Sequence, residues 1–426
     1  MAGWKTRRAA LVKHLLPMIS PAMVSAGDGS FERAPNLHVR RRCAAGVARV
    51  SFFRSVHCGN TFRLALTRLR DDDGGVSMNK YVWRGLVAAF VALLAIPLAT
   101  PASAQATRTW ISGVGDDANP CSRTAPCKTF AGAISKTAAG GEINCLDPGG
   151  FGAVTITKSI SLICEGVLDG ILLTSGNGIN IVVGANDVVL LSGFDIQGLG
   201  LGTNGIRFTS GVGLHLRNST IRGFRGSGGY GINFAPTSPA ATLVVDNVTI
   251  VDNGATSGTT GGILVQPAAN VAATVAITNI RLTDNNRGGI RFDAANAGSS
   301  IKATVSNSVI ADNQIGVYAR SAAGGGTANV VLIDSVVSGN SSSGLLAEGA
   351  NATINATGNS IAQNSNGVRA LTGGNLVSFG DNVLVGNNNN GAFTATVRQA
   401  VSLGRGAGAM RTGSAFPMAS LWGESP

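Results

Sequence analysis

Charged, aromatic and imidazole side chains are all scarce in this chain of 426 residues. Asp, Glu, Lys and Arg make up 13% of it, and Phe, Trp and Tyr 5%. There are four histidines, and His215 is the only one after residue 77. A Ser/His/Asp catalytic group needs a histidine as its base. After residue 77, only His215 could fill that role.

A long apolar run is also lacking. The apolar run near the start, Leu86 to Leu98, is interrupted only by Pro97 and is shorter than the roughly 20 residues of a membrane span. A basic start at 78–84 precedes it, and the small-residue sequence Ala102-Ser-Ala104 follows it. This order predicts a secretory signal peptide over 78–104 rather than a transmembrane anchor.

The net charge of +11 is unevenly distributed. Residues 1–77 hold 13 Lys and Arg against 5 Asp and Glu, whereas residues 105–426 hold 18 against 17. The part of the chain expected to fold is therefore close to neutral, which excludes the basic surface of a nucleic-acid-binding protein.

One pattern of four positions, spread over nine residues, recurs through the later two-thirds of the chain. An apolar residue is followed by Asn two places on, an aliphatic residue three further and Asn three beyond that, as in Val245/Asn247/Ile250/Asn253. The aliphatic position recurs eight times in steps of 23 to 32 residues, at 196, 221, 250, 282, 310, 337, 361 and 384. A repeat of this length indicates one supersecondary unit stacked on itself.

Each unit is predicted to consist of short strands. Apolar residues alternate, as in Gly205-Ile-Arg-Phe208, which is the period of a strand. The repeats are rich in Gly, Asn, Ser, Thr and Val, which are poor helix formers. About 27 residues then make one coil of about three strands, and coils stacked at about 4.8 Å form a parallel β-helix.

The asparagine columns support stacking independently. Backbone groups at a sharp inward corner need partners, and an inward Asn can supply them and also bond to the Asn of the next coil. We expect such ladders at two positions of the repeat. The last position carries Asn253, Asn285, Asn313, Asn340, Asn364 and Asn387. The second position carries Asn218, Asn247, Asn279 and Asn307, with Asp334 and Asp381 in later copies.

On these repeats, residues 142–397 resemble the right-handed parallel β-helix repeat proteins of the pectate-lyase-like superfamily. The resemblance covers about 60% of the chain. It implies an all-β, right-handed parallel β-helix of about nine to ten coils, with a short N-terminal capping helix. It implies no activity, because enzymes and non-catalytic surface proteins share this fold.

The resemblance carries over no catalytic residue. Polygalacturonase-like enzymes have an Asn-Thr-Asp element, an Asp-Asp pair on a coil and a Gly-His-Gly, and pectate-lyase-like enzymes an Arg-x-Pro-x-x-Arg element. None of these occurs in the coils, and the pair Asp116-Asp117 lies before them.

The predicted domain organisation follows from these boundaries. Residues 1–77 read as an N-terminal extension, disordered and produced by a start assigned too early, with a long leader or a basic arm as the alternatives. Residues 105–141 form a disulfide-closed loop and a capping helix, since Phe130, Ala133 and Ile134 share one helical face. The β-helix follows over 142–397, and residues 398–426 form a flexible C-terminal tail.

Four cysteines follow the signal peptide, and an even number in an exported chain predicts two disulfides. Of the three connectivities we favour Cys121–Cys127, which closes a short loop, and Cys145–Cys164, which lie one short coil apart. Stacked strands bring Cα atoms within disulfide range. A zinc site is the rival interpretation, but no histidine lies nearby.

Three outward features are candidates for function. Asp252, Asp284 and Asp312 precede ladder asparagines on consecutive coils and could divide acid and base roles or bind Ca²⁺, although Asp is also a common turn residue. Arg207, Arg291, Tyr318 and Arg369 lie in one outward column, with Asn233, Leu264 and Leu346 between them, and suit sugar stacking and uronate carboxylates. His215, with Arg217, Arg222 and Arg225 nearby, is the third, and a lone surface histidine usually has no catalytic role.

These features favour an exported, non-catalytic surface or extracellular protein, acting as a structural or glycan-binding rod. The alternative is a carbohydrate-active lyase, hydrolase or epimerase acting on an acidic polysaccharide. We predict no cofactor, with Ca²⁺ at the three Asp residues as an option, and a secreted, periplasmic or cell-surface location. A polysaccharide or cell-surface glycan is the expected partner, with no membrane span after signal cleavage.

Overall fold

The computed structural model describes residues 79–95, 105–167 and 169–397, and it divides the chain into two units, 1–96 and 97–426. In the first unit, α1 (Lys80–Ala95) covers the basic start and most of the apolar run of the predicted signal peptide. No helix among the described residues has the length and apolar character needed to span a membrane. The signal peptide itself stays a prediction, and the extension 1–77 and the tail 398–426 lie outside the described residues.

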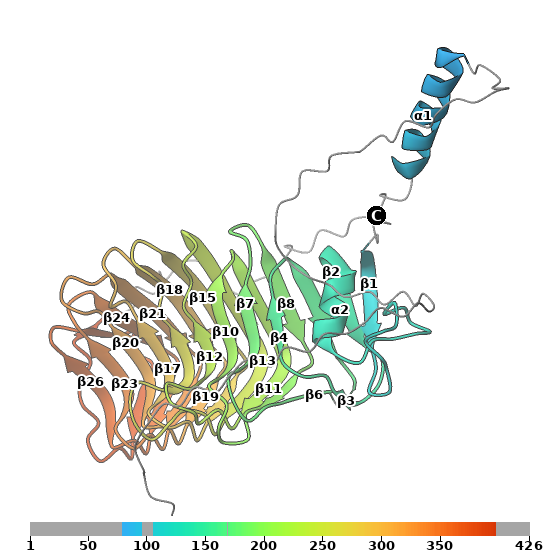
Figure 1. Ribbon diagram of the computed structural model, residues 1–426. Coiled ribbons are helices and arrows are strands. Elements are labelled where there is room, and N and C mark those ends of the chain that lie inside the picture. Colours follow the sequence, from blue (N-terminus) through green and yellow to red (C-terminus); the bar gives the residue numbers. More distant parts are fainter. Residues whose placement is uncertain (1–78, 96–104, 168, 398–426) are drawn as a thin grey trace, which may run out of the picture. The chain divides into compact units, whose positions relative to one another are not determined.

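The second unit is a parallel β-helix of about ten coils, in which every named strand pairs in parallel with its neighbours (Figure 1). Each coil contributes a strand to up to three positions. The first position begins with β1 (Ala106–Ile111) and ends with β29 (Ala395–Thr396). Between them come β2 (Thr137–Cys145), β5 (Ile160–Ile163), β8 (Val188–Ser192), β11 (Gly213–Arg222), β13 (Ala240–Val251), β15 (Ala272–Thr278), β18 (Ser300–Ser306), β21 (Thr327–Ile333), β24 (Ala352–Thr357) and β27 (Asn375–Ser378).

The second position follows a corner and holds short strands. In two coils this strand is the end of β11 or β13, which continue past the corner. The others are β3 (Gly149–Gly150), β6 (Asp169–Leu172), β9 (Asp195–Gln197), β16 (Arg281–Thr283), β19 (Val309–Ala311), β22 (Val336–Ser338), β25 (Ser360–Ala362) and β28 (Val383–Val385). First and second positions together make a 20-stranded sheet.

The third position forms a separate sheet of nine strands. They are β4 (Val154–Ile156), β7 (Asn177–Val182), β10 (Asn204–Ser210), β12 (Tyr230–Phe234), β14 (Gly261–Val265), β17 (Gly288–Asp293), β20 (Ile315–Arg320), β23 (Ser343–Glu348) and β26 (Asn366–Leu371). The fold class predicted from the repeat is thus confirmed.

The core consists of the predicted apolar columns. In the aliphatic column, the residues from Ile196 to Ile361 are fully buried, and Leu384 in the last coil is partly buried. In the nine-stranded sheet, Phe208, Phe234, Val265 and Phe292 stand in register and are fully buried. The rings of Phe208 and Phe234 stack with centroids 4.6 Å apart. Burying such columns on every coil supplies the hydrophobic stabilisation of a fold with few aromatic residues.

One asparagine ladder is present as predicted. From Asn253 to Asn364 the residues are at most 2% exposed, and Asn387 is half-buried. Each side-chain amide donates to the Oδ1 atom of the next ladder residue at 2.8–3.2 Å. That same Oδ1 atom also accepts the backbone N–H of the preceding Asn, so the ladder satisfies both side-chain and main-chain groups at the corner.

The second predicted ladder was wrong in its orientation. Asn218, Asn247, Asn279 and Asn307 are exposed, and their φ angles are between 49° and 55°. Asn tolerates this left-handed conformation, which the turn between first and second strand positions requires. The inward position is the next residue, where Ser308, Ser335 and Asn359 accept backbone N–H groups from the coil before.

The helix expected to close the first coil is α2 (Phe130–Lys136), next to β1 and β2 (Figure 1). Thr129 caps it by accepting the N–H of Gly132 at 3.0 Å. Phe130 is fully buried, and its ring lies 5.6 Å from that of Phe151 and 5.5 Å from that of Phe194. The helix therefore covers the apolar interior at the start of the β-helix.

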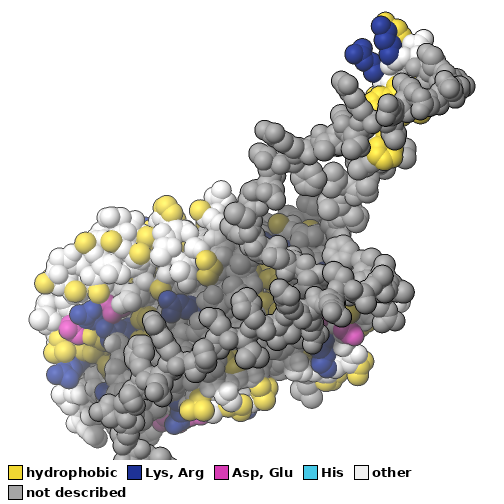
Figure 2. Space-filling view, viewed as in Figure 1, with side chains coloured by type: hydrophobic (Ala, Val, Ile, Leu, Met, Phe, Trp, Pro, Cys, Tyr) yellow, Lys and Arg dark blue, Asp and Glu magenta, His cyan; other side chains and the backbone are white. Residues whose placement is uncertain are grey.

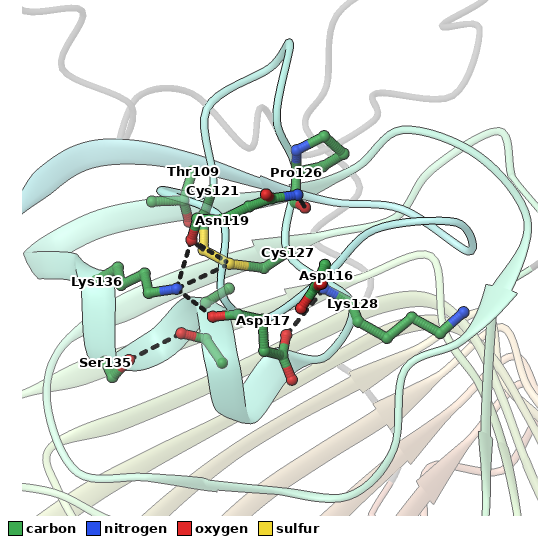
Figure 3. The surroundings of a disulfide bond; sticks show 12 residues. Thr109, Asp116, Asp117, Asn119, Cys121, Pro126, Cys127, Lys128, Ser135 and Lys136 are labelled. Carbon is green, nitrogen blue, oxygen red and sulfur yellow. Dashed lines mark hydrogen bonds between the residues drawn. A yellow bond between two sulfur atoms is a disulfide. The ribbon is translucent and has the colours of Figure 1, made fainter.

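Both predicted disulfides are present. The Cα atoms are 4.6 Å apart in Cys121–Cys127 and 4.7 Å apart in Cys145–Cys164. Beside the first, Lys136 of α2 donates to the carbonyl oxygens of Asp117 and Asn119 (Figure 3). The loop 105–129 is thus tied both to itself and to the capping helix.

We expect the double variant Cys145→Ser/Cys164→Ser to lose about 3 kcal/mol of stability, because the bridge closes a loop of 19 residues in sequence. Urea unfolding of the wild type and the variant, both under oxidising conditions, measures the difference in free energy of unfolding. The variant Cys121→Ser/Cys127→Ser, whose bridge spans only 6 residues in sequence, is the control and should lose less. An unchanged unfolding midpoint would show that this bridge does not restrain the unfolded chain.

Candidate functional site

The three predicted Asp residues lie at one corner of the β-helix, directly before the asparagine ladder. Their φ angles are 62°, 58° and 56° for Asp252, Asp284 and Asp312. The same corner is occupied by Gly339 and Gln363 in the next two coils, also at positive φ. The turn conformation therefore explains why Asp, which tolerates it, occurs here.

These residues also line a cleft of about 860 Å³, which we call the turn cleft. Arg225 and Arg287 line it with them, together with Asn286, Gln314 and Ser341. Sequence reasoning missed Arg287, Gln314 and Ser341. They follow the ladder asparagines by one or two residues, so the repeat could have indicated them. Asp252, Asp284, Asp312 and Gly339 lie on four consecutive coils, and Arg225 lies on the coil before them.

The charged groups of the turn cleft differ in their partners. Arg225 forms an ion pair with Asp252. Among the described residues, Asp284 and Asp312 have no side-chain hydrogen bond or ion pair, and neither has Arg287, whose buried Nε atom is unsatisfied. Arg287 also has a φ of 68°, an unfavourable conformation for a long side chain. The cleft thus presents two carboxylates and one guanidinium to a ligand.

The predicted outward column of the nine-stranded sheet is present in full register. Arg207 pairs with Asn233, and the column continues through Leu264, Arg291, Tyr318, Leu346 and Arg369. Arg207 and Arg369 are exposed, whereas Tyr318 is 8% exposed. The candidates in the middle of the column are therefore much less accessible than those at its ends.

The middle of this column belongs to an ion network that the sequence did not predict. Asp293, 3% exposed, accepts from Arg291 at 2.8 Å and from Arg320 at 3.0 Å. Arg291 also lies over the ring of Tyr318 at 4.6 Å, and Tyr318 donates to Glu348. Period-two alternation places Asp293, Arg320 and Glu348 on the same face, two residues after the predicted column, and this signal could have found them.

The tyrosines of this sheet are poor bases. Burial, followed by the hydrogen bond to Glu348, raises the pKa of Tyr318 to about 12. Burial raises the pKa of Tyr230 to about 12 as well. Both phenols therefore keep their protons at neutral pH, and proton abstraction by either is unfavourable.

His215 lies outside the turn cleft, in a groove on the outer face of the first-position strands. Of the arginines near it in sequence, Arg217 lines the same groove but pairs with Glu165. Arg222 pairs with Asp195 and Arg225 with Asp252, outside this groove. The predicted Asp set, the Arg/Tyr column and His215 thus occupy three different places and do not form one pocket. Among the coloured atoms in Figure 2, white and yellow predominate and charged side chains are few, in agreement with a charged content of 13%.

The fold defines this chain as a parallel β-helix protein. Residues 200–401 match the family described as "Periplasmic copper-binding protein (NosD)". The match covers 202 of the 426 residues and lies over the coils. The family description agrees with an exported, periplasmic or surface location, as predicted.

Two solved structures are similar to the chain. A pectate lyase, Pel9A, has a TM-score of 0.47 and 14% identity, over 69% of this chain and 80% of its own. A rhamnogalacturonan lyase has a TM-score of 0.31 and 13% identity, over 68% of this chain and 86% of its own. No curated protein matches the chain.

The described residues do not fit a copper ion. Copper favours imidazole, thiolate and thioether ligands. Within 79–95, 105–167 and 169–397, His215 is the single histidine, the four cysteines are in disulfides, and there is no methionine. No three His, Cys, Asp or Glu residues in these ranges converge on a metal position.

The three Asp residues predicted as a Ca²⁺ option do not converge on a metal position either. Asp252, Asp284 and Asp312 are set one coil apart, and Asp252 is engaged by Arg225, so the three carboxylates do not form a ligand set.

Proposed function

We propose that the chain is an exported, non-catalytic β-helix protein that binds an acidic glycan in the turn cleft. The observation that carries this proposal is the unpaired set of Asp284, Asp312 and Arg287 in one cleft. Carboxylates accept hydrogen bonds from sugar hydroxyls, and a guanidinium binds a uronate carboxylate with two parallel bonds.

The cleft suits a repeating ligand because it is itself repetitive. Its lining extends over five consecutive coils, from Arg225 to Gly339 and Ser341, which rise by about 4.8 Å each. Gln314 and Ser341 add neutral hydrogen-bonding groups beside the charged ones. A chain of sugars lying along the β-helix axis would meet similar polar groups at each coil.

A non-catalytic role is favoured by the chemistry of the groups available. His215, the single histidine of the described part, lies outside the turn cleft, and the tyrosines of the nine-stranded sheet keep their protons. The arginines and acids in the middle of that sheet are paired with one another. These groups therefore offer no free general acid or base, and the enzymatic alternative depends on Asp284 and Asp312 of the turn cleft.

We expect Arg287→Ala to weaken binding of an oligogalacturonate about tenfold or more, because its carboxylate would lose a charge-assisted bidentate partner. Calorimetric titration of the purified full chain measures the affinity. A neutral oligosaccharide of equal length should be affected less. Arg207→Ala, which removes an exposed arginine on another face, is the matched control. Equal losses for both variants would contradict the assignment of the glycan to the turn cleft.

The alternative is a carbohydrate-active enzyme, and one observation favours it. Asp284 and Asp312 are unpaired on consecutive coils, so a spacing of about 4.8 Å brings their carboxylates near the roughly 5 Å separation of retaining glycosidases. Release of shortened oligosaccharides or unsaturated products, abolished by Asp284→Ala, would establish an enzyme and overturn the non-catalytic proposal.

A further inference from the structure

A groove of about 710 Å³ crosses the outer face of the first-position strands β5, β8, β11, β13 and β15. Its outward residues stand in register, Ser161 with Leu190, Leu190 with His215, His215 with Val244 and Val244 with Ala276. Val188 lies at its edge and is 41% exposed. We call it the His215 groove, and aliphatic side chains dominate its outward surface.

On this sheet face, the apolar side chains are concentrated in the groove. The outward column that contains His215, Val244 and Ala276 continues on the next three coils as Thr304, Val331 and Asn355. The neighbouring outward column continues as Lys302 and Asn329. Asn355 and Asn329 are hydrogen-bonded to each other at 2.9 Å. The same sheet face is therefore ordinary polar surface outside the groove, with Val331 as its aliphatic exception.

The imidazole of His215 is the available polar group at the centre. Within the described residues its ring nitrogens have no hydrogen-bond partner. The neighbouring Gly213 has no side chain, and a Cβ atom there would come within 3.7 Å of His215 Nε2. Burial lowers the pKa of His215, so the ring is neutral at neutral pH and can accept one hydrogen bond.

The groove offers no unpaired positive charge. Arg217 at its edge pairs with Glu165 at 3.4 Å and donates to Ser192 at 3.1 Å. Asp246, the acid at that edge, accepts from Asn279 at 3.0 Å. An anionic ligand would therefore lose its hydration without gaining a free counter-charge, which is unfavourable.

We infer that the His215 groove binds a small neutral aromatic alcohol, whose ring packs on Leu190 and Val244 and whose hydroxyl donates to His215. Its volume is within the range of small-molecule sites, and apolar walls with one fixed polar group match their usual composition. This site is separate from the turn cleft and does not depend on the proposed glycan binding.

The test uses the full chain with 1-naphthol and naphthalene as probes, both uncharged at neutral pH. We expect saturable binding with one site per chain, seen by probe fluorescence, and a shift of the His215 ring resonances in NMR spectra. His215→Phe should weaken 1-naphthol about fivefold, the value of one hydrogen bond of roughly 1 kcal/mol, and leave naphthalene unchanged.

A pair of matched variants separates the groove from the rest of the face. Val244→Glu places a charge inside the groove and should weaken both probes tenfold or more. Val331→Glu makes the same change at the equivalent strand position outside it and should have no effect. Circular dichroism checks that both variants fold.

Three results would overturn the inference. The first is no saturable binding of either probe. The second is an equal loss from Val331→Glu. The third is a concentration-dependent dimer that Val244→Glu dissociates, which would assign this face to a second copy of the chain.

Discussion

Asn313→Ala is expected to lower the free energy of unfolding by about 4 kcal/mol. Asn313 is 2% exposed, and its Oδ1 atom accepts from both the backbone and the side chain of Asn285. Its amide also donates to the carbonyl oxygens of Leu282 and Ala311. Alanine would leave several buried groups without partners, each at about 1–3 kcal/mol. Urea unfolding followed by circular dichroism measures the loss.

The control for this prediction is Asn307→Gly, in the exposed asparagine column at the turn between the first and second strand positions. Asn307 is exposed with a φ of 50°, a conformation that glycine adopts without strain. Its loss should stay below about 0.5 kcal/mol. Similar losses for both variants would contradict the distinction between a structural inner ladder and an exposed turn column. Hydrogen exchange should show the effect of Asn313→Ala first in the adjacent coils, because solenoid coils depend on their nearest neighbours.

Asp293→Ala should be destabilising by about 3–5 kcal/mol, because it leaves two arginines without their shared partner in a largely buried place. The side chains of Arg291 and Arg320 are 17% and 29% exposed, and that of Asp293 is 4% exposed. Asp293→Asn keeps the shape and one hydrogen-bond acceptor but removes the charge, and an intermediate loss is expected. Urea unfolding gives both values.

Arg108→Ala provides the comparison for an exposed ion pair. Arg108 contacts Glu142 at 3.1 Å, but its side chain is 60% exposed, so the variant should lose less than about 1 kcal/mol. If Asp293→Ala cost no more than Arg108→Ala, the network would be a surface feature that water readily replaces. A glycan-binding assay of Asp293→Asn also tests whether the middle of the sheet column contacts a ligand.

Most of the fold could be predicted because stacked coils repeat the same residue pattern at equivalent positions. The alternation around Phe208, Phe234 and Phe292 indicated the nine-stranded sheet, and these residues stand in register in the core. The column ending in Asn387 indicated the inner ladder. The second Asn column was misjudged because both an inward ladder and a left-handed turn favour asparagine, and composition alone does not separate them.

The candidate sites could be predicted only in part. Spacing placed Asp252, Asp284 and Asp312 in one column, and they do line one cleft. It did not reveal that Arg225 neutralises Asp252 while Arg287 lies unpaired beside the other two. It likewise placed Arg291 and Tyr318 on an outer face without indicating that Asp293 and Glu348 engage them. Pairing depends on side-chain directions across coils, which a one-dimensional repeat does not contain.

The amino-acid sequence by itself determined that this chain coils into a parallel β-helix, where its corners lie and which cysteines meet. These follow from period-two alternation, turn chemistry and the distance between stacked strands, all of which are local or repeat at a constant interval. Only the tertiary structure decided which outward groups are paired, which are buried and which stand free in a cleft. That outcome depends on the burial and partners of each side chain, and these are properties of neighbouring coils together rather than of any one segment.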